Sequence, residues 1–210
     1  MKATAEGVRL RPAQVEDFGP ALAGELLYAT DPHIFGYMHA HDEARAVRHL
    51  GHHWAQGESL FSHVHAVVAD FEGEAVALEL GFDRATQDAH TLPFVRVAQA
   101  FLPEAEFGEL VRWFEYGGFV IPPVPADAYY LQNLAATPEA RGRGIGERLL
   151  EDCFERARAA GRGRVQLDLY DGNPAQRLYE RVGMRTIVET RVNALEADGI
   201  GVHLRMEIKL

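Results

Sequence analysis

The sequence of 210 residues contains a single cysteine, Cys153. One cysteine cannot form a disulfide within the chain, which favours a reducing compartment over an oxidising one. The sequence also has no apolar run long enough to span a membrane, and its first residues lack the apolar stretch of a secretory signal. These absences predict a cytoplasmic protein with no membrane partner.

Basic residues are scarce as well, because 21 lysines and arginines face 31 acids and the formal net charge at pH 7 is −10. Such a charge argues against nucleic acid as the main partner. The segment 141–164 is the exception, with seven arginines and four acids. We expect Arg156, Arg158 and Arg162 to form ion pairs on a solvated helix face. Arg141 and Arg143 stand in a glycine-rich loop, where an anion is the better partner.

That glycine-rich loop lies between a predicted strand and a predicted helix. An apolar run from Tyr129 to Ala136 predicts the strand, and glycines 142, 144 and 146 follow it. The helix is predicted by apolar residues at helical spacing, which are Ile145, Leu149, Leu150, Cys153, Phe154 and Ala157. The first N–H groups of a helix have no partner within it, and the helix dipole adds positive potential. Glycines let an anion approach those groups closely, so the loop predicts a phosphate-binding cradle.

Known motifs narrow the class of phosphate-containing ligand that this loop would bind. The chain has no Gly-x-x-x-x-Gly-Lys-Ser/Thr run, and its Gly-x-Gly-x-Gly spacing departs from the dinucleotide-binding Gly-x-Gly-x-x-Gly. The run Arg141-x-x-Gly144-x-Gly146 instead resembles the Arg/Gln-x-x-Gly-x-Gly/Ala signature of the GNAT superfamily of N-acetyltransferases. The segment Leu178–Met184 is similar to that family's Leu-Tyr-x-x-x-Gly-Phe. The resemblance covers about the C-terminal 80 residues well, and the rest only by its order of elements.

The resemblance implies an α/β (α+β) fold with a mixed central β-sheet flanked by helices and a helical insertion between strands 3 and 4. We expect one domain over 1–210, with the insertion at about 84–127 split by Pro103, since a structureless connection of that length is uncommon. Strands are expected at 8–11, 62–70, 74–82, 128–136, 165–170, 185–192 and 202–210, and helices at 17–30, 42–56, 144–160 and 174–181. Asp31-Pro32-His33 is predicted to end the first helix.

The resemblance also implies roles for particular residues. In the family the loop binds the pyrophosphate of acetyl-coenzyme A, and the strand before it splays from its neighbour to expose N–H groups for the acetyl carbonyl and the pantetheine arm. In this sequence the matching residues are Leu134 and Ala136 on the strand and Arg141, Gly142, Arg143, Gly144, Ile145 and Gly146 in the loop. Tyr179, four residues before Gly183, matches the tyrosine that protonates the departing thiolate. Asn173 either contacts the coenzyme or caps the following helix.

The general base stays open at this stage. Some family members place a carboxylate where this chain has Tyr130, and a tyrosine is no base at neutral pH. Glu79 and Asp127 are alternatives, and each is better explained as a surface acid. The leading function is transfer of an acetyl group from acetyl-CoA to an amine within a ternary complex. A non-catalytic acyl-CoA-binding module and a nucleotide-dependent oxidoreductase, with Asp168 binding a ribose, are the alternatives.

The amine acceptor must contact whatever covers the sheet opposite the coenzyme. Segments 30–56 and 83–127 can do so, and both mix aromatic residues with acids. The aromatic residues are Phe35, Tyr37, Trp54, Phe107, Trp113, Phe114 and Tyr116, and the acids are Asp42, Glu43, Glu104, Glu106, Glu109 and Glu115. This mixture predicts an amine of a small molecule or a peptide. A homodimer is an open alternative to a monomer. His49, His52 and His53 share a helix face, which we interpret as a partly exposed face and not as a metal site.

Overall fold

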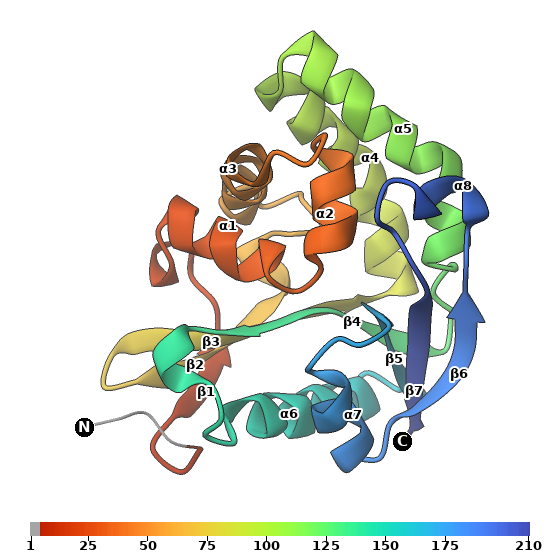
Figure 1. Ribbon diagram of the computed structural model, residues 1–210. Helices are drawn as coiled ribbons and strands as arrows, with labels where there is room; N and C mark the ends of the chain where they lie inside the picture. The colour runs from red at the N-terminus through yellow and green to blue at the C-terminus, as the bar shows by residue number, and fades with distance from the viewer. Residues whose placement is uncertain (1–4) are drawn as a thin grey trace.

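The computed structural model describes residues 5–210, which form a seven-stranded sheet in the order β1-β2-β3-β4-β5-β7-β6 (Figure 1). The strands are β1 (Arg9–Pro12), β2 (Ala66–Phe71), β3 (Glu74–Asp83), β4 (Ala128–Ala136), β5 (Arg164–Tyr170), β6 (Arg185–Thr190) and β7 (His203–Lys209). The pair β4–β5 is parallel, and the other neighbouring pairs are antiparallel. The mixed sheet confirms the predicted fold class.

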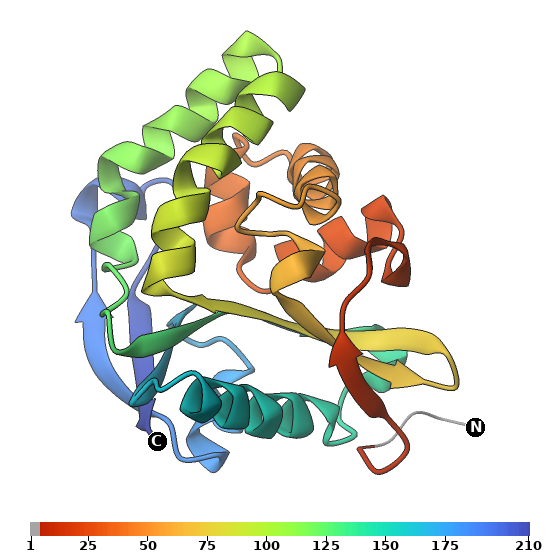
Figure 2. The same ribbon diagram turned by 180° about the vertical axis from the view of Figure 1, so that it is seen from behind.

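Helices cover both faces of the sheet. They are α1 (Pro20–Tyr28), α2 (Pro32–Met38), α3 (Glu43–Trp54), α4 (Arg84–Phe101), α5 (Glu104–Val120), α6 (Ile145–Ala159), α7 (Gln176–Arg181) and α8 (Asn193–Glu196). Helices α6 and α7 lie on one face and α1 to α5 on the other, as the two opposite views show (Figures 1 and 2). No helix within residues 5–210 combines the length and apolar character needed to cross a membrane.

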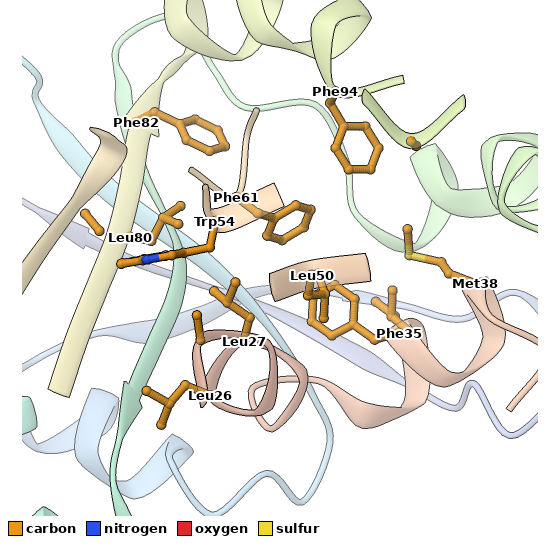
Figure 3. Close-up of a cluster of buried hydrophobic side chains, with 14 of the residues drawn as sticks. Leu26, Leu27, Phe35, Met38, Leu50, Trp54, Phe61, Leu80, Phe82 and Phe94 are labelled. Atoms are coloured by element: carbon orange, nitrogen blue, oxygen red, sulfur yellow. The ribbon is translucent and has the colours of Figure 1, made fainter. Parts of the chain in front are cut away.

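Each face has its own apolar core. On the α1–α5 face, aromatic side chains from several elements meet, among them Phe35, Trp54, Phe61 and Phe94 (Figure 3). On the α6–α7 face, the C-terminal part of the apolar stripe predicted for α6 packs against β4, β5 and β7, and its first residues, Ile145 and Leu149, pack near β2 and β3. Burial of Cys153 in that stripe confirms its predicted place in the packing.

The parallel strands β4 and β5 separate after only three residue pairs. Pairing joins Ala128–Tyr130 to Arg164–Gln166, and no pair follows, although β4 continues to Ala136 and β5 to Tyr170. On its other side β4 pairs with β3 from Tyr129 to Ala136, with one extra residue, Gln132, between two register positions. Such a bulge bends a strand and increases its twist. The sheet is therefore open on one side of β4, immediately before the glycine loop.

The insertion between β3 and β4 consists of α4 and α5, as predicted, and Pro103 stands between them. Other boundaries differ from expectation. Asp31-Pro32-His33 starts α2 instead of ending a helix, because the Asp31 side chain caps the helix and Pro32 takes its first position. Residues 63–65, predicted as strand, form a 3₁₀ turn capped by Ser62.

Candidate active site

The glycine loop closes around the N-terminus of α6. Gly142 has φ +69° and Gly144, the N-cap of α6, has φ +77°. Residues with a Cβ rarely adopt this left-handed region, so both positions require glycine. At Gly146 a Cβ would lie 3.1 Å from Cδ2 of Leu178. The absence of a Cβ there lets α6 and α7 pack closely. The spacing seen in the sequence thus has a local structural cause at each of the three positions.

Arginines surround the cradle. Arg141, Arg143, Arg177 and Arg181 line the same cavity as the loop. Nε of Arg141 donates to the carbonyl oxygen of Ala136 at 3.1 Å, which ties the loop to the end of β4. Arg143 also contacts other parts of the chain, and its carbonyl accepts from the N–H of Ala5 at 3.1 Å. Guanidinium groups are well suited to phosphate oxygens, so this end of the cavity favours a polyanion.

The open edge of β4 presents backbone donors. The N–H of Thr137 donates to the carbonyl of Val76 on the strand β3 side at 2.9 Å. Because successive N–H groups of a strand point to alternate sides, the N–H groups of Ala136 and Leu134 point away from β3. They face the gap left by β5. These are the two strand positions that the sequence singles out.

Tyr179 lies on α7, is 7 % exposed and lines the cavity. Burial raises the pKa of Tyr179 well above its usual range, so the phenol stays protonated at neutral pH. We find no hydrogen-bond partner for its hydroxyl among residues 5–210. A neutral phenol at a cavity wall is chemically able to donate a proton.

One cavity of about 910 Å³ brings the predicted site residues together. Its wall includes Leu134, Ala136, Arg141, Gly142, Arg143, Gly144, Ile145, Gly146, Asn173 and Tyr179. From the cradle the wall continues to α2, α4 and α5 on the other side of the sheet. A single space thus connects the anion-binding end to the helical insertion.

Asn173 has both polar atoms of its side chain in contact with the protein. Oδ1 accepts from the N–H of Ala175 at 2.9 Å, and Nδ2 donates to the carbonyl of Thr30 at 3.3 Å. Helix α7 begins at Gln176, so Asn173 stabilises the turn before the helix and is not its N-cap. The prediction that Asn173 caps this helix is therefore wrong, because Ala175 is the N-cap and has no side chain that could accept the bond.

Among the acids weighed from the sequence, Asp168 lines the cavity but is already paired. Nε and a terminal nitrogen of Arg205 donate to its two oxygens at 3.0 and 2.6 Å. The hydroxyl of Tyr130 donates to the same carboxylate at 2.9 Å. Asp168 is consequently a compensated buried charge and not a free acceptor for a ribose.

The expectation that Glu79 is a surface acid is wrong. Glu79 is fully buried under α6, where Arg156 donates to it, and it is not part of the cavity wall. Arg156 is accordingly more than a residue of a solvated face. Burial raises the pKa of Glu79 to about 7. Asp127 is an exposed acid, as expected, and pairs with Arg164 at 2.7 Å.

The expectation of a partly exposed histidine face is also wrong. His49 is 1 % exposed and His53 is fully buried. Hydrogen bonds connect Ser59 Oγ to His53 (2.7 Å), His53 to His49 (2.8 Å), His49 to His39 (2.8 Å) and His39 to the carbonyl of Phe35 (2.7 Å). Burial lowers the pKa of all three histidines, so their rings are neutral at neutral pH. Since a carbonyl can only accept, His39 donates to Phe35, and with neutral rings each bond of the series then donates from Ser59 towards Phe35. Burial lowers the pKa of His49 to about 2 and that of His53 to about 3.

The mixture of aromatic residues and acids expected around the acceptor is only partly present. Phe35, Trp113 and Phe114 line the cavity, whereas Trp54 lies in the core. None of the expected acids lines it; Glu106 and Glu109, for example, pair with Arg45. The acids that do line it are Asp31, Glu147 and Asp168. Sequence reasoning missed Asp31, because Asp-Pro reads equally as the end of a helix or the start of one.

Comparison with known proteins agrees with this geometry. The model of the acetyltransferase (GNAT) family matches residues 39–184, more than half of the chain. The chain belongs to the GNAT family, and the protein is an acyltransferase. A search of curated proteins gave no match.

Solved structures share the fold. An acetyltransferase is 21 % identical with a TM-score of 0.67, over 96 % of this chain and 98 % of that one. An N-acetyltransferase from Staphylococcus aureus Mu50 is 17 % identical with a TM-score of 0.67, over 95 % and 100 %. A polyamine N-acetyltransferase from Drosophila melanogaster is 20 % identical with a TM-score of 0.60, over 97 % and 100 %. At these identities the likeness concerns the fold.

Proposed function

We propose that the protein transfers an acetyl group from acetyl-CoA to an amine of a small molecule or peptide, directly and within a ternary complex. The observation that carries this proposal is the single cavity, which joins an arginine-rich phosphate cradle, the open edge of β4 and Tyr179 to a wall of helices. Both substrates have room in the same space, as direct transfer requires.

Each group along the cavity has a part in the reaction. The loop Arg141–Gly146 holds the pyrophosphate, and the N–H groups of Leu134 and Ala136 bind the pantetheine arm and the acetyl carbonyl. A donor aimed at that carbonyl stabilises the negative charge that develops on its oxygen. The amine nitrogen forms a bond to the carbonyl carbon and loses a proton, while the C–S bond breaks and Tyr179 protonates the sulfur. Tyr179 regains a proton from the nitrogen, so the products are the amide and coenzyme A.

The cradle is tested by Gly144→Glu, which puts a negative side chain where the pyrophosphate would bind. Gly161→Glu is the control for the positive φ, because Gly161 has φ +71° at the other end of α6. Gly161 lies in open space, whereas a Cβ at Gly144 would lie 3.3 Å from Cβ of Ala5. We expect Gly144→Glu to weaken acetyl-CoA binding at least about 100-fold in calorimetry, and Gly161→Glu to leave it unchanged. Unchanged affinity in a folded Gly144→Glu variant would contradict the phosphate assignment.

The proton donor is tested by Tyr179→Phe after thiol release has identified an acceptor in a panel of amines, amino acids, peptides and aminoglycosides. We expect kcat to fall by about 10²–10⁴-fold with little change in acetyl-CoA affinity. Tyr116→Phe, in the half-buried part of α5 outside the cavity wall, is the control. Equal activity of Tyr179→Phe would assign the tyrosine a structural role. Binding of acetyl-CoA without thiol release on any amine would favour the non-catalytic module.

A further inference from the structure

The loop between α1 and α2 bridges the gap between β4 and β5. Thr30 is held from both sides of that gap, because Nδ2 of Asn133 on β4 donates to its hydroxyl at 2.8 Å and Nδ2 of Asn173 after β5 donates to its carbonyl at 3.3 Å. Its hydroxyl also donates to the carbonyl of Leu27 at 2.8 Å. The next residue, Asp31, is therefore fixed at the place where the two strands have separated.

The Asp31 carboxylate is held by two further elements. Oδ1 accepts from the N–H of Ile34 at 3.0 Å, as the N-cap of α2, and Oδ2 lies 3.1 Å from Nε2 of His203 on β7. His203 is buried. A carboxylate oxygen can accept two hydrogen bonds, so each oxygen retains capacity for a partner in the cavity that Asp31 lines.

Apart from Asp168, the cavity wall around Asp31 is uncharged. Residues contributed by α2, α4 and α5 are apolar or neutral, among them Ile34, Phe35, Met38, Phe94 and Trp113. Asp168 is the other acid of this side, and Arg205 compensates its charge. Glu147 lies at the cradle end and pairs with Arg181 at 3.4 Å. Of the acids that line the cavity in the described part of the chain, Asp31 is the one without an arginine or lysine partner.

We propose that Asp31 binds the ammonium group of the acceptor and takes its proton, and that the acceptor is a primary amine with an apolar alkyl or aryl body. This inference rests on the proposed function. An ammonium group that enters an apolar cavity needs a counter-ion and hydrogen-bond acceptors, and Asp31 supplies both. Phe35, Phe94 and Trp113 give the body of the amine an apolar wall.

The proton balance of this step is simple. The N–H bond of the ammonium breaks, its proton moves to a carboxylate oxygen of Asp31, and the nitrogen keeps the electron pair that then attacks the acetyl carbon. The proton leaves Asp31 for solvent before the next turnover. Titratable groups around Asp31 include His203 on β7, Tyr130 on β4 and Tyr170 on β5. The charged pair of Asp168 and Arg205 lies on the same side of the cavity. Burial raises the pKa of both tyrosines, so they stay neutral during the step.

The first experiment measures binding alone. Protein saturated with coenzyme A is titrated with 2-phenylethylamine and with 2-phenylethanol, which has the same body and no charge. We expect the wild type to prefer the amine by at least about tenfold, and Asp31→Asn to lose that preference. Asparagine also caps helices, so Asp31→Asn keeps the start of α2. Asp31→Glu and Glu43→Gln, an exposed acid outside the cavity wall, should both retain the preference.

The second experiment follows kcat/KM for 2-phenylethylamine against pH. We expect kcat/KM of Asp31→Asn to be about 10²–10⁴-fold lower than that of the wild type at neutral pH. It should then rise tenfold per pH unit towards the pKa of the amine, because only the free base of the amine can react in this variant. The kcat/KM of the wild type should not change over that pH range. No preference for the amine in the wild type, or an unchanged preference in Asp31→Asn, would overturn the binding role. Parallel pH profiles would overturn the proton transfer. An amine preference without thiol release would contradict the proposed function and leave the Asp31 binding site standing.

Discussion

Tyr129 and Tyr130 are neighbours on β4, yet they reach opposite faces of the sheet, and each meets a buried acid and an arginine. Under α6, a terminal nitrogen of Arg156 donates to the Tyr129 hydroxyl at 2.9 Å and another donates to Glu79. On the α1–α5 face, the Tyr130 hydroxyl donates to Asp168, which Arg205 also binds. A tyrosine, an arginine and a carboxylate thus form a network on each face, and the two tyrosines are adjacent in the sequence.

The networks differ in how completely the acid is paired. Both oxygens of Asp168 receive hydrogen bonds, and Arg205 is buried and donates further to the carbonyls of Pro122 and Pro123. Glu79 has one oxygen, Oε1, without a hydrogen-bond partner among residues 5–210, and Arg156 is one-third exposed. The fully paired network supports the cavity wall, where a carboxylate must keep its position. The other lies in the core of the α6–α7 face, where Glu79 takes up a proton near neutral pH.

Replacing the arginine of each network should reveal the largest difference in stability between the two networks. Arg205→Met leaves Asp168 buried without compensation and should lower the free energy of unfolding by about 3–5 kcal/mol. Arg156→Met should cost less, about 1–2 kcal/mol, because Glu79 can become neutral. Urea denaturation at pH 7 measures both, and Arg205→Met with Asp168→Leu should recover part of the loss. Equal losses for the two single variants would show that the difference in pairing has no energetic consequence.

The hydrogen-bonded series of His39, His49 and His53 on the α1–α5 face is a second case in which buried polar groups are paired. His49→Leu leaves nitrogen atoms of His39 and His53 without partners and should cost about 2–4 kcal/mol. His52 lies on the same helix but is half-exposed and takes no part in these hydrogen bonds, so His52→Leu should lower the free energy of unfolding by less than about 1 kcal/mol. The folded pKa of His49 lies below the ordinary 6.5, so its contribution is complete above pH 6.5 and declines as pH falls from there. The free energies of unfolding of the wild type and His49→Leu can be measured from pH 5 to 8. A difference between them that did not shrink below pH 6.5 would contradict this prediction.

The last expected effect concerns the Glu79 proton. Its folded pKa of about 7 lies above the ordinary 4.5, so the favourable contribution of Glu79 is present below pH 4.5 and is lost as pH rises to about 7. Relative to the wild type, Glu79→Gln should therefore gain about 2–3 kcal/mol of stability between pH 5 and pH 8. Denaturation curves at the two pH values measure the change. A constant difference would place the Glu79 pKa outside this range.

Sequence patterns predicted the α6–α7 half of the molecule well, because its signals are local. Glycine spacing predicted the loop before α6 within six residues, and helical periodicity predicted the buried stripe of α6. The α1–α5 half depends on contacts between distant positions. Asp31 meets His203 across 172 residues, and Thr30 meets Asn133 across 103. Helical spacing placed His49 and His53 on one face but could not say that His39, from another element, would cover that face.

The order of strands in the sheet has a consequence for how the protein is made. β7 lies between β5 and β6 although it follows both in the sequence, so β6 has no neighbour in the sheet until β7 has been synthesised. β7 also carries His203 and Arg205, the partners of Asp31 and Asp168. A nascent chain folds from its N-terminal side as it emerges. The carboxylates of Asp31 and Asp168 therefore gain these partners only when the last strand has been made.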